Sequence, residues 1–212
     1  SETIRALAAH PDLESYFEEA PAAAAELLRA ADSLAQRAYE GNDTAALHQL
    51  HKALYLLYEE NLRPSGASDV YNQYNPQLIG VRNRLERHWE AFERSRSPIA
   101  KDDVPVDPDA FRAYFKELSV GHKMVGHRLF DFLNDEATRD DLIAFFLSDA
   151  AVIVRFCDLV VMSMVGVDDE IRPELAENFW DEMGRGQFQE RHVHLYRNLL
   201  EYAGVNLPGD AL

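Results

Sequence analysis

Apolar residues recur every three or four positions through most of this chain, and that period constrains the fold more than any other feature. The spacing gathers apolar side chains on one face of an α-helix, whereas the alternation typical of a β-strand is nearly absent. Hydrophobic residues make up 47% of the 212, which is enough to bury a core without cross-links. We therefore predict an all-α protein.

Turn residues divide the first half of the chain into helices. Proline is tolerated in a first helical turn, so a helix is expected to include Pro21 at its start and to close at Gly41. Asp43 or Thr44 should cap the next helix, since short polar side chains accept hydrogen bonds from the first turn. Residues 63–76 carry turn formers and are predicted to be a loop.

Residues 98–110 contain three prolines and four aspartates, which is typical of a linker. We place a boundary there and predict a helical N-terminal extension over 1–97 and a helical core over 98–212, with one continuous domain as the alternative. In the second part, a helix capped near Thr138 is expected to become an apolar helix over 142–166.

The net charge of the chain limits the molecules that it can bind. The chain holds 37 acidic residues against 21 Lys and Arg, a net charge of -16, which repels nucleic acid and anionic lipid. The apolar 142–166 stretch is long enough to span a bilayer of about 30 Å. It carries Asp149, Arg155 and Asp158, however, and each charge at mid-membrane costs roughly 2.5 to 3.5 kcal/mol, so a helix buried in protein is expected.

The cysteine content and the first residues of the chain indicate in which cellular compartment the protein is expected. The single cysteine, Cys157, cannot form an internal disulfide and lies in an apolar run, which favours a reduced cytoplasm and an inert thiol. The first residues have no basic stretch followed by an apolar one, so we expect no secretory signal. A cytoplasmic location is the expectation.

Asp149 lies among apolar residues and needs a partner. A desolvated carboxylate must be hydrogen-bonded, ion-paired, protonated or bound to a metal, since burying it alone costs several kcal/mol. From the sequence, a metal and an ordinary hydrogen bond are equally good explanations. Arg155 and Asp158 are three residues apart on a helix and are expected to pair.

Glu182 and His192 are ten residues apart in a segment that otherwise predicts an aromatic, apolar helix. A straight helix would leave their side chains roughly 80° apart, so we expect the helix to bend, with Gly184 and Gly186 allowing a kink or a local unwinding. Two glycines inside a helix cost about 1 kcal/mol each relative to alanine, which favours a functional reason for them. His194 points roughly 200° from His192 and is expected to face solvent or a residue that supports the ligands rather than the metal itself.

Asp149, Glu182 and His192 are therefore the predicted metal ligands. Carboxylates and imidazoles without cysteine favour iron or manganese over zinc in a helical core. The sequence shows no phosphate-binding glycine loop, nucleophile elbow or H-E-x-x-H motif. No catalytic residue or organic cofactor site is assigned.

Residues 174–200, "ELAENFWDEMGRGQFQERHVHLYRNLL", resemble the heme-oxygenase-like non-heme diiron oxidases and oxygenases, the iron-containing redox enzymes. The match is to that family's E-x-x-x-N-x-x-D-E-x-G-x-G run, whose second acid and the histidine ten residues later ligate iron. The resemblance thus implies iron ligation by Glu182 and His192. The family's F-L-x-E glutamate corresponds to Asp149 in "FFLSD". The likeness covers about residues 105–205.

The resemblance implies a heme-oxygenase-like helical bundle with Fe(II), two ions per complete site, and O2 as co-substrate. Two departures stand out. Asp149 is one methylene shorter than the family's glutamate, which would draw the ligand back by about 1.5 Å. The family's later His-x-x-x-Asp-x-x-His helix has no counterpart in these 212 residues, so the bundle is expected to be incomplete at its C-terminal end.

Two functions follow from this reading. The first is an O2-dependent non-heme iron oxidase or oxygenase that acts on a small amine, amino-acid-like or fatty-acid-like substrate in a biosynthetic pathway. The second is a non-catalytic helical paralogue or subunit, used for binding or oligomerisation, with an incomplete metal site. A heme-degrading enzyme would need His10 as proximal ligand, and its setting makes a poor helix interior. Long amphipathic faces over 1–100 could serve a homodimer.

Overall fold

The computed structural model describes residues 1–62, 72–100 and 103–205. These residues form helices joined by turns, and no strand occurs among them, which confirms the all-α prediction. Most of the loop predicted over 63–76 lies outside the described residues. The chain divides into two compact units, Ser1–Pro105 and Val106–Leu212.

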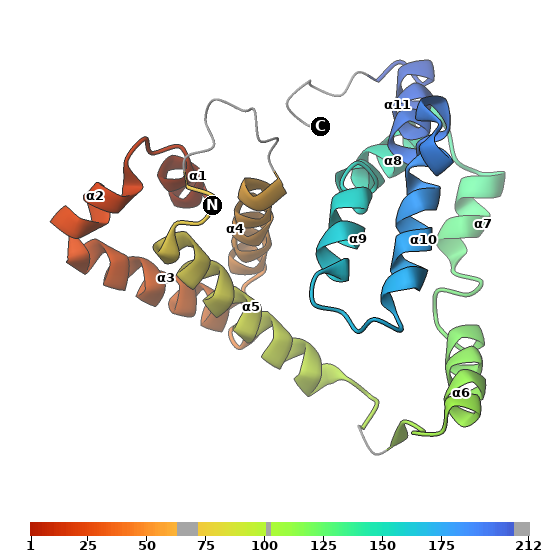
Figure 1. Ribbon diagram of the computed structural model, residues 1–212, viewed down its shortest axis with the longest axis horizontal. Helices are drawn as coiled ribbons and strands as arrows, with labels where there is room; N and C mark the ends of the chain where they lie inside the picture. The colour runs from red at the N-terminus through yellow and green to blue at the C-terminus, as the bar shows by residue number, and fades with distance from the viewer. Residues whose placement is uncertain (63–71, 101–102, 206–212) are drawn as a thin grey trace. The chain divides into compact units, whose positions relative to one another are not determined.

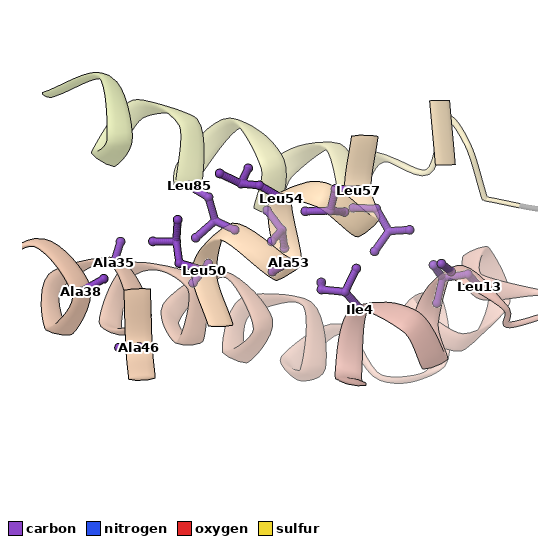
Figure 2. Packing of buried hydrophobic residues seen from close by; sticks show 14 of the residues in the cluster. Ile4, Leu13, Ala35, Ala38, Ala46, Leu50, Ala53, Leu54, Leu57 and Leu85 are labelled. Carbon is purple, nitrogen blue, oxygen red and sulfur yellow. The ribbon is translucent and has the colours of Figure 1, made fainter. Parts of the chain in front are cut away.

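The first unit consists of helices packed around one hydrophobic core. Helices α3 and α5 pack on each other and both contact α4, with α1 against α4 and α2 against α3 (Figure 1). Figure 2 shows the apolar side chains that meet between them, among which Leu50, Leu54 and Leu85 are almost fully buried. The helices are α1 (Glu2–Ala8), α2 (Leu13–Glu19), α3 (Pro21–Tyr39), α4 (Thr44–Leu62) and α5 (Pro76–Arg96).

Helix caps in this unit follow the expected chemistry. Pro21 is the first residue of α3, where its missing N–H goes unused. Asp43 Oδ1 accepts a hydrogen bond from the Ala46 backbone N–H at 3.0 Å, so the aspartate rather than Thr44 caps α4. Arg37 holds the same carboxylate at 2.6 Å. Together with that cap bond, Arg37 keeps the pKa of Asp43 below its usual value.

The second unit has a much thinner core. Helix α9 packs on α10, and α11 packs on α8 (Figure 1). Among the described residues of this unit, the buried apolar side chains are Ala150, Val160 and Leu200. The elements are α6 (Pro108–Val120), α7 (Arg128–Asp135), α8 (Arg139–Ile153), α9 (Phe156–Met164), α10 (Arg172–Glu182), the 3-10 turns η2 (Gly184–Gly186) and η3 (Phe188–Glu190), and α11 (His192–Tyr202).

The apolar stretch over 142–166 is not one helix. Its start is as expected, because Thr138 caps α8 in a capping box with Asp141. The helix ends at Ile153, inside a run of three β-branched residues (Val152 to Val154), and Arg155, at φ -112° and ψ 2°, leaves the helical conformation before α9 begins. Arg155 and Asp158 pair at 4.0 Å as predicted. No helix among the described residues has the length and hydropathy needed to cross a bilayer.

Candidate metal centre

Glu182 and His192 lie at facing ends of two helices. Glu182 is the last residue of α10, and His192 is the first of α11. Glu182 Oε2 lies 2.7 Å from His192 Nδ1. The carboxylate is 15% exposed and the imidazole 52%, so a shielded oxygen donor meets a nitrogen donor that solutes can reach. The structure therefore brings these two predicted ligands together.

The segment between them is not the bent helix expected from the sequence. Helix α10 ends at Glu182, and two 3-10 turns lead to a separate helix, α11. Gly184, Arg185 and Gly186 have φ of 62°, 51° and 85°, three left-handed residues in a row that no α-helix accommodates. This turn reverses the chain so that residues ten apart meet, which a bend alone would not do.

Both glycines of this turn also make close approaches. A Cβ on Gly184 would lie 2.6 Å from the Glu190 carbonyl carbon, and a Cβ on Gly186 would lie 2.9 Å from Trp180 Cη2. Arg185 tolerates its left-handed backbone while its Nε donates to Asp181 Oδ1 at 2.6 Å. That hydrogen bond lowers the pKa of Asp181. The turn is thus held by one ion pair and by two positions that exclude a side chain.

Asp149 lies on α8, which packs against α11. It is half-buried rather than enclosed by apolar residues as predicted. Tyr196, one turn beyond His192, donates its hydroxyl to the Phe146 carbonyl oxygen at 2.5 Å. Burial raises the pKa of Tyr196, and the nearby charge of Asp149 raises it further. Asp149 therefore belongs to the helix that packs against α11, and its charge acts on Tyr196.

Other side chains near the pair have ordinary partners. His194 Nε2 lies 2.7 Å from Gln189 Oε1, and its ring tilts against Phe188. Burial raises the pKa of Cys157, and the charge of Glu182 adds to the rise, so the thiol stays protonated. Sequence reasoning missed Tyr196, although its position four residues after His192 places it on the same face of α11.

An open, polar depression adjoins the exposed side of the His192 ring. Its walls are formed by α10, the 3-10 turns and the start of α11, and the lining residues are Asp181, Gly184, Arg185, Gln187, Glu190 and His192. It gives small polar molecules access to the imidazole.

One protein family matches the part of the chain that contains these residues. Residues 144–211 match the iron-containing redox enzymes. The matched range contains all three predicted ligands, and it confirms the resemblance stated from the sequence. The description of this family suggests an oxidoreductase role and iron as its metal. Neither the curated proteins nor the solved structures give a match.

The donor chemistry of Glu182 and His192 suits iron. Two ligands in adjacent positions on one octahedral ion, with bonds of about 2.1 Å, lie roughly 3 Å apart, and the observed N···O separation is 2.7 Å. The described residues contain no group of three His, Cys, Asp or Glu side chains placed to hold a metal. The structure thus supplies two of the three expected donors in one place, and the role of Asp149 stays a prediction.

Proposed function

We propose that this protein is a non-heme iron oxidoreductase that uses O2 to oxidise a small amine, amino-acid-like or fatty-acid-like substrate in a biosynthetic pathway. One observation carries the proposal: the 2.7 Å approach of Glu182 and His192, within the range that matches iron-containing redox enzymes. When bound, Fe(II) would bind O2 and supply the electrons that reduce it.

Glu182 and His192 have distinct parts in this proposal. The carboxylate of Glu182 is shielded from water by its neighbours, so its charge attracts a cation more strongly than an exposed acid would. His192 contributes a nitrogen donor from the rim of the open depression, where a small solute can approach it. Glu182 ends α10 and His192 begins α11, and the 3-10 turns between these helices bring the two side chains to face each other.

Asp149 is proposed as the third donor. It lies on α8, which packs against α11, and its side chain would turn toward the pair when a cation draws the carboxylates together. The Tyr196 hydroxyl on α11 donates to the carbonyl oxygen of Phe146, which lies on α8 one turn before Asp149. That bond would keep α8 in place against α11 while Asp149 turns.

A non-catalytic helical protein is the second candidate. The observation that favours it is that no three-donor group is assembled among the described residues. In that case Glu182 and His192 form a structural ion pair, which joins the ends of α10 and α11. Such a protein would bind iron weakly and would not consume O2.

Anaerobic loading with Fe(II) separates the two candidates. The full chain is loaded and desalted, its iron content is measured, and O2 uptake is then followed. We expect retained iron and O2 uptake in the wild type and a loss of both in Glu182→Gln and His192→Ala. Matched controls on the same two helices are Glu177→Gln, at an exposed position, and His194→Ala; both should retain iron. Equal iron in all variants, or none in the wild type, rules out the proposed enzyme.

A further inference from the structure

The two nitrogens of the His192 ring have different surroundings. Nδ1 lies 2.7 Å from Glu182 Oε2, on the side where the carboxylate is only 15% exposed. The hydrogen bonds and ion pairs of the described residues involve the ring through this nitrogen alone. The imidazole is 52% exposed and lines the open depression between α10, the 3-10 turns and α11. Because the nitrogens of an imidazole point in diverging directions, Nδ1 is the inner nitrogen and Nε2 the outer one.

The contact with Glu182 determines which way the ring is turned. A ring turned over about the Cβ–Cγ bond would place Cδ2, a carbon, at the position that Nδ1 of His192 occupies. Even weak C–H···O contacts have carbon–oxygen distances of about 3.3–3.6 Å, well beyond the 2.7 Å observed. That distance is typical of a charge-assisted N–H···O hydrogen bond, at about 2.7–2.9 Å. Nδ1 therefore faces the carboxylate.

The backbone around the pair also favours Nδ1. His192 is the first residue of α11, and the residue before it, Arg191, is extended. The space beside Gly184 that a Cβ would fill is closed by the Glu190 carbonyl carbon and the Arg191 nitrogen, at 2.6 and 2.7 Å. The chain that enters α11 thus packs tightly on the turn that follows Glu182. Nδ1 is the ring nitrogen nearer the backbone, so it meets the carboxylate at this short range.

A metal ion that uses both donors must enter at the Nδ1 edge of the ring. A ligating imidazole nitrogen carries no proton, and the other nitrogen keeps its N–H for an outer partner. Ligation through Nε2 would require the ring to turn away from Glu182 and break the 2.7 Å contact. Ligation through Nδ1 requires only that the metal replace the proton between the two side chains.

We infer that His192 binds iron through Nδ1 and keeps an N–H at Nε2 toward the depression. The inference rests on the proposed iron centre and names the atom that holds the metal there. Iron then lies on the inner side of the ring, together with Glu182. A solute in the depression meets the Nε2–H edge, which donates a hydrogen bond to water or to a carboxylate or carbonyl oxygen. The exposed edge of the ring is therefore a hydrogen-bond donor rather than an open position on the metal.

Methylated histidines test which nitrogen holds the metal, since each blocks one nitrogen and leaves the other. The full chain is made with Nε2-methylhistidine in place of His192, loaded anaerobically with Fe(II) and desalted. The added methyl group lies on the exposed side of the ring, so this variant should fold as the wild type does. We expect it to retain as much iron as the wild type and to show imidazole scattering at the iron edge. Nδ1-methylhistidine at the same position should retain almost none.

A measurement on the iron-free chain tests the orientation of the ring by itself. Nitrogen NMR of isotope-labelled histidines distinguishes a protonated from an unprotonated ring nitrogen, and the His192 signals are assigned by their loss in His192→Ala. In mildly alkaline buffer we expect the proton on Nδ1, because this nitrogen donates to Glu182. Glu182→Ala should remove that preference, whereas His194→Ala should leave the His192 signals unchanged.

The possible results separate this inference from the proposed function. Loss of iron with Nε2-methylhistidine, retention with Nδ1-methylhistidine, or a proton on Nε2 in the iron-free wild type would each overturn the inference. If the wild type retains iron and the Nε2-methyl variant does not, the proposed oxidoreductase stands and only the choice of nitrogen is wrong. A wild type that retains no iron overturns both. Circular dichroism of each variant distinguishes loss of a ligand from loss of the fold.

Discussion

One side chain joins α8 and α11 beside the candidate metal centre. Tyr196 is the link, since its hydroxyl donates to the Phe146 carbonyl oxygen across the two helices. Tyr196→Phe should lower the free energy of unfolding by about 1 kcal/mol. It should also weaken Fe(II) binding, because α8, which carries Asp149, would be held less firmly against α11. Denaturant unfolding and an iron titration measure the two effects. Tyr202→Phe, on the same helix but 90% exposed, should change neither.

A second tyrosine makes the stability of the first unit depend on alkaline pH. Burial raises the pKa of Tyr58 to about 12, and its hydrogen bond to Glu86 Oε1 at 2.9 Å adds to the rise. Above pH 10 the unfolded chain loses this proton while the folded chain keeps it. The stabilising contribution is therefore complete below pH 10 and is lost as pH rises toward 12.

In Tyr58→Phe, the unfolding free energy should fall less steeply with pH between pH 10 and 12 than it does in the wild type. Chemical denaturation at several pH values across this window measures the slope. Tyr74→Phe is the control, because Tyr74 is 75% exposed and its removal should leave the slope unchanged. An identical slope in Tyr58→Phe would contradict the assignment.

At the scale of elements, the turn between α10 and α11 determines whether the two ligands meet. Gly184→Ala should disrupt it, because a Cβ would lie 2.6 Å from backbone and φ is 62°. Gly166→Ala is a matched control, since φ is 76° there and nothing lies within 4 Å of the added Cβ. Both substitutions incur about 1–2 kcal/mol of left-handed strain. Only Gly184→Ala should also abolish iron binding, as measured by retained iron after desalting.

Comparison of the predicted and observed helices shows which features of the fold are encoded by neighbouring residues. Apolar period and caps predicted α3 and α4 well, because Pro21 and Asp43 act through neighbours in the chain. The break at Arg155 was missed, since an apolar run reads alike for one helix or two. The two glycines marked the site, but the turn they form was not foreseen. It depends on the approach of Gly184 to Glu190 and of Gly186 to Trp180, which spacing does not reveal.

At the scale of the whole molecule, the two units differ in how they are stabilised. The first buries Leu54 and its neighbours in a continuous core. Leu54→Ala should therefore cost about 2–5 kcal/mol of unfolding free energy. Because this residue belongs to the first unit and both close ligands belong to the second, iron retained by the folded variant should equal that of the wild type. Lost iron in a still-folded Leu54→Ala would contradict that separation.

The candidate site was predictable only in part, because one of its residues is far from the others in the sequence. Glu182 and His192 lie ten residues apart, and their glycine turn leaves a local signal. Asp149 lies more than thirty residues before Glu182, so its distance from the pair depends on how α8 packs against α11. Its partial exposure and its nearness to Tyr196 follow from that packing, which helical period alone does not specify.

X-ray absorption at the iron edge of the Fe(II)-loaded chain tests the central claim most directly, because it reports the atoms bound to the metal. Imidazole scattering from a histidine ligand is expected in the wild type and in His194→Ala, and it should be lost in His192→Ala. Imidazole scattering that persists in His192→Ala, or iron bound with oxygen ligands alone in the wild type, would contradict a redox centre built on Glu182 and His192.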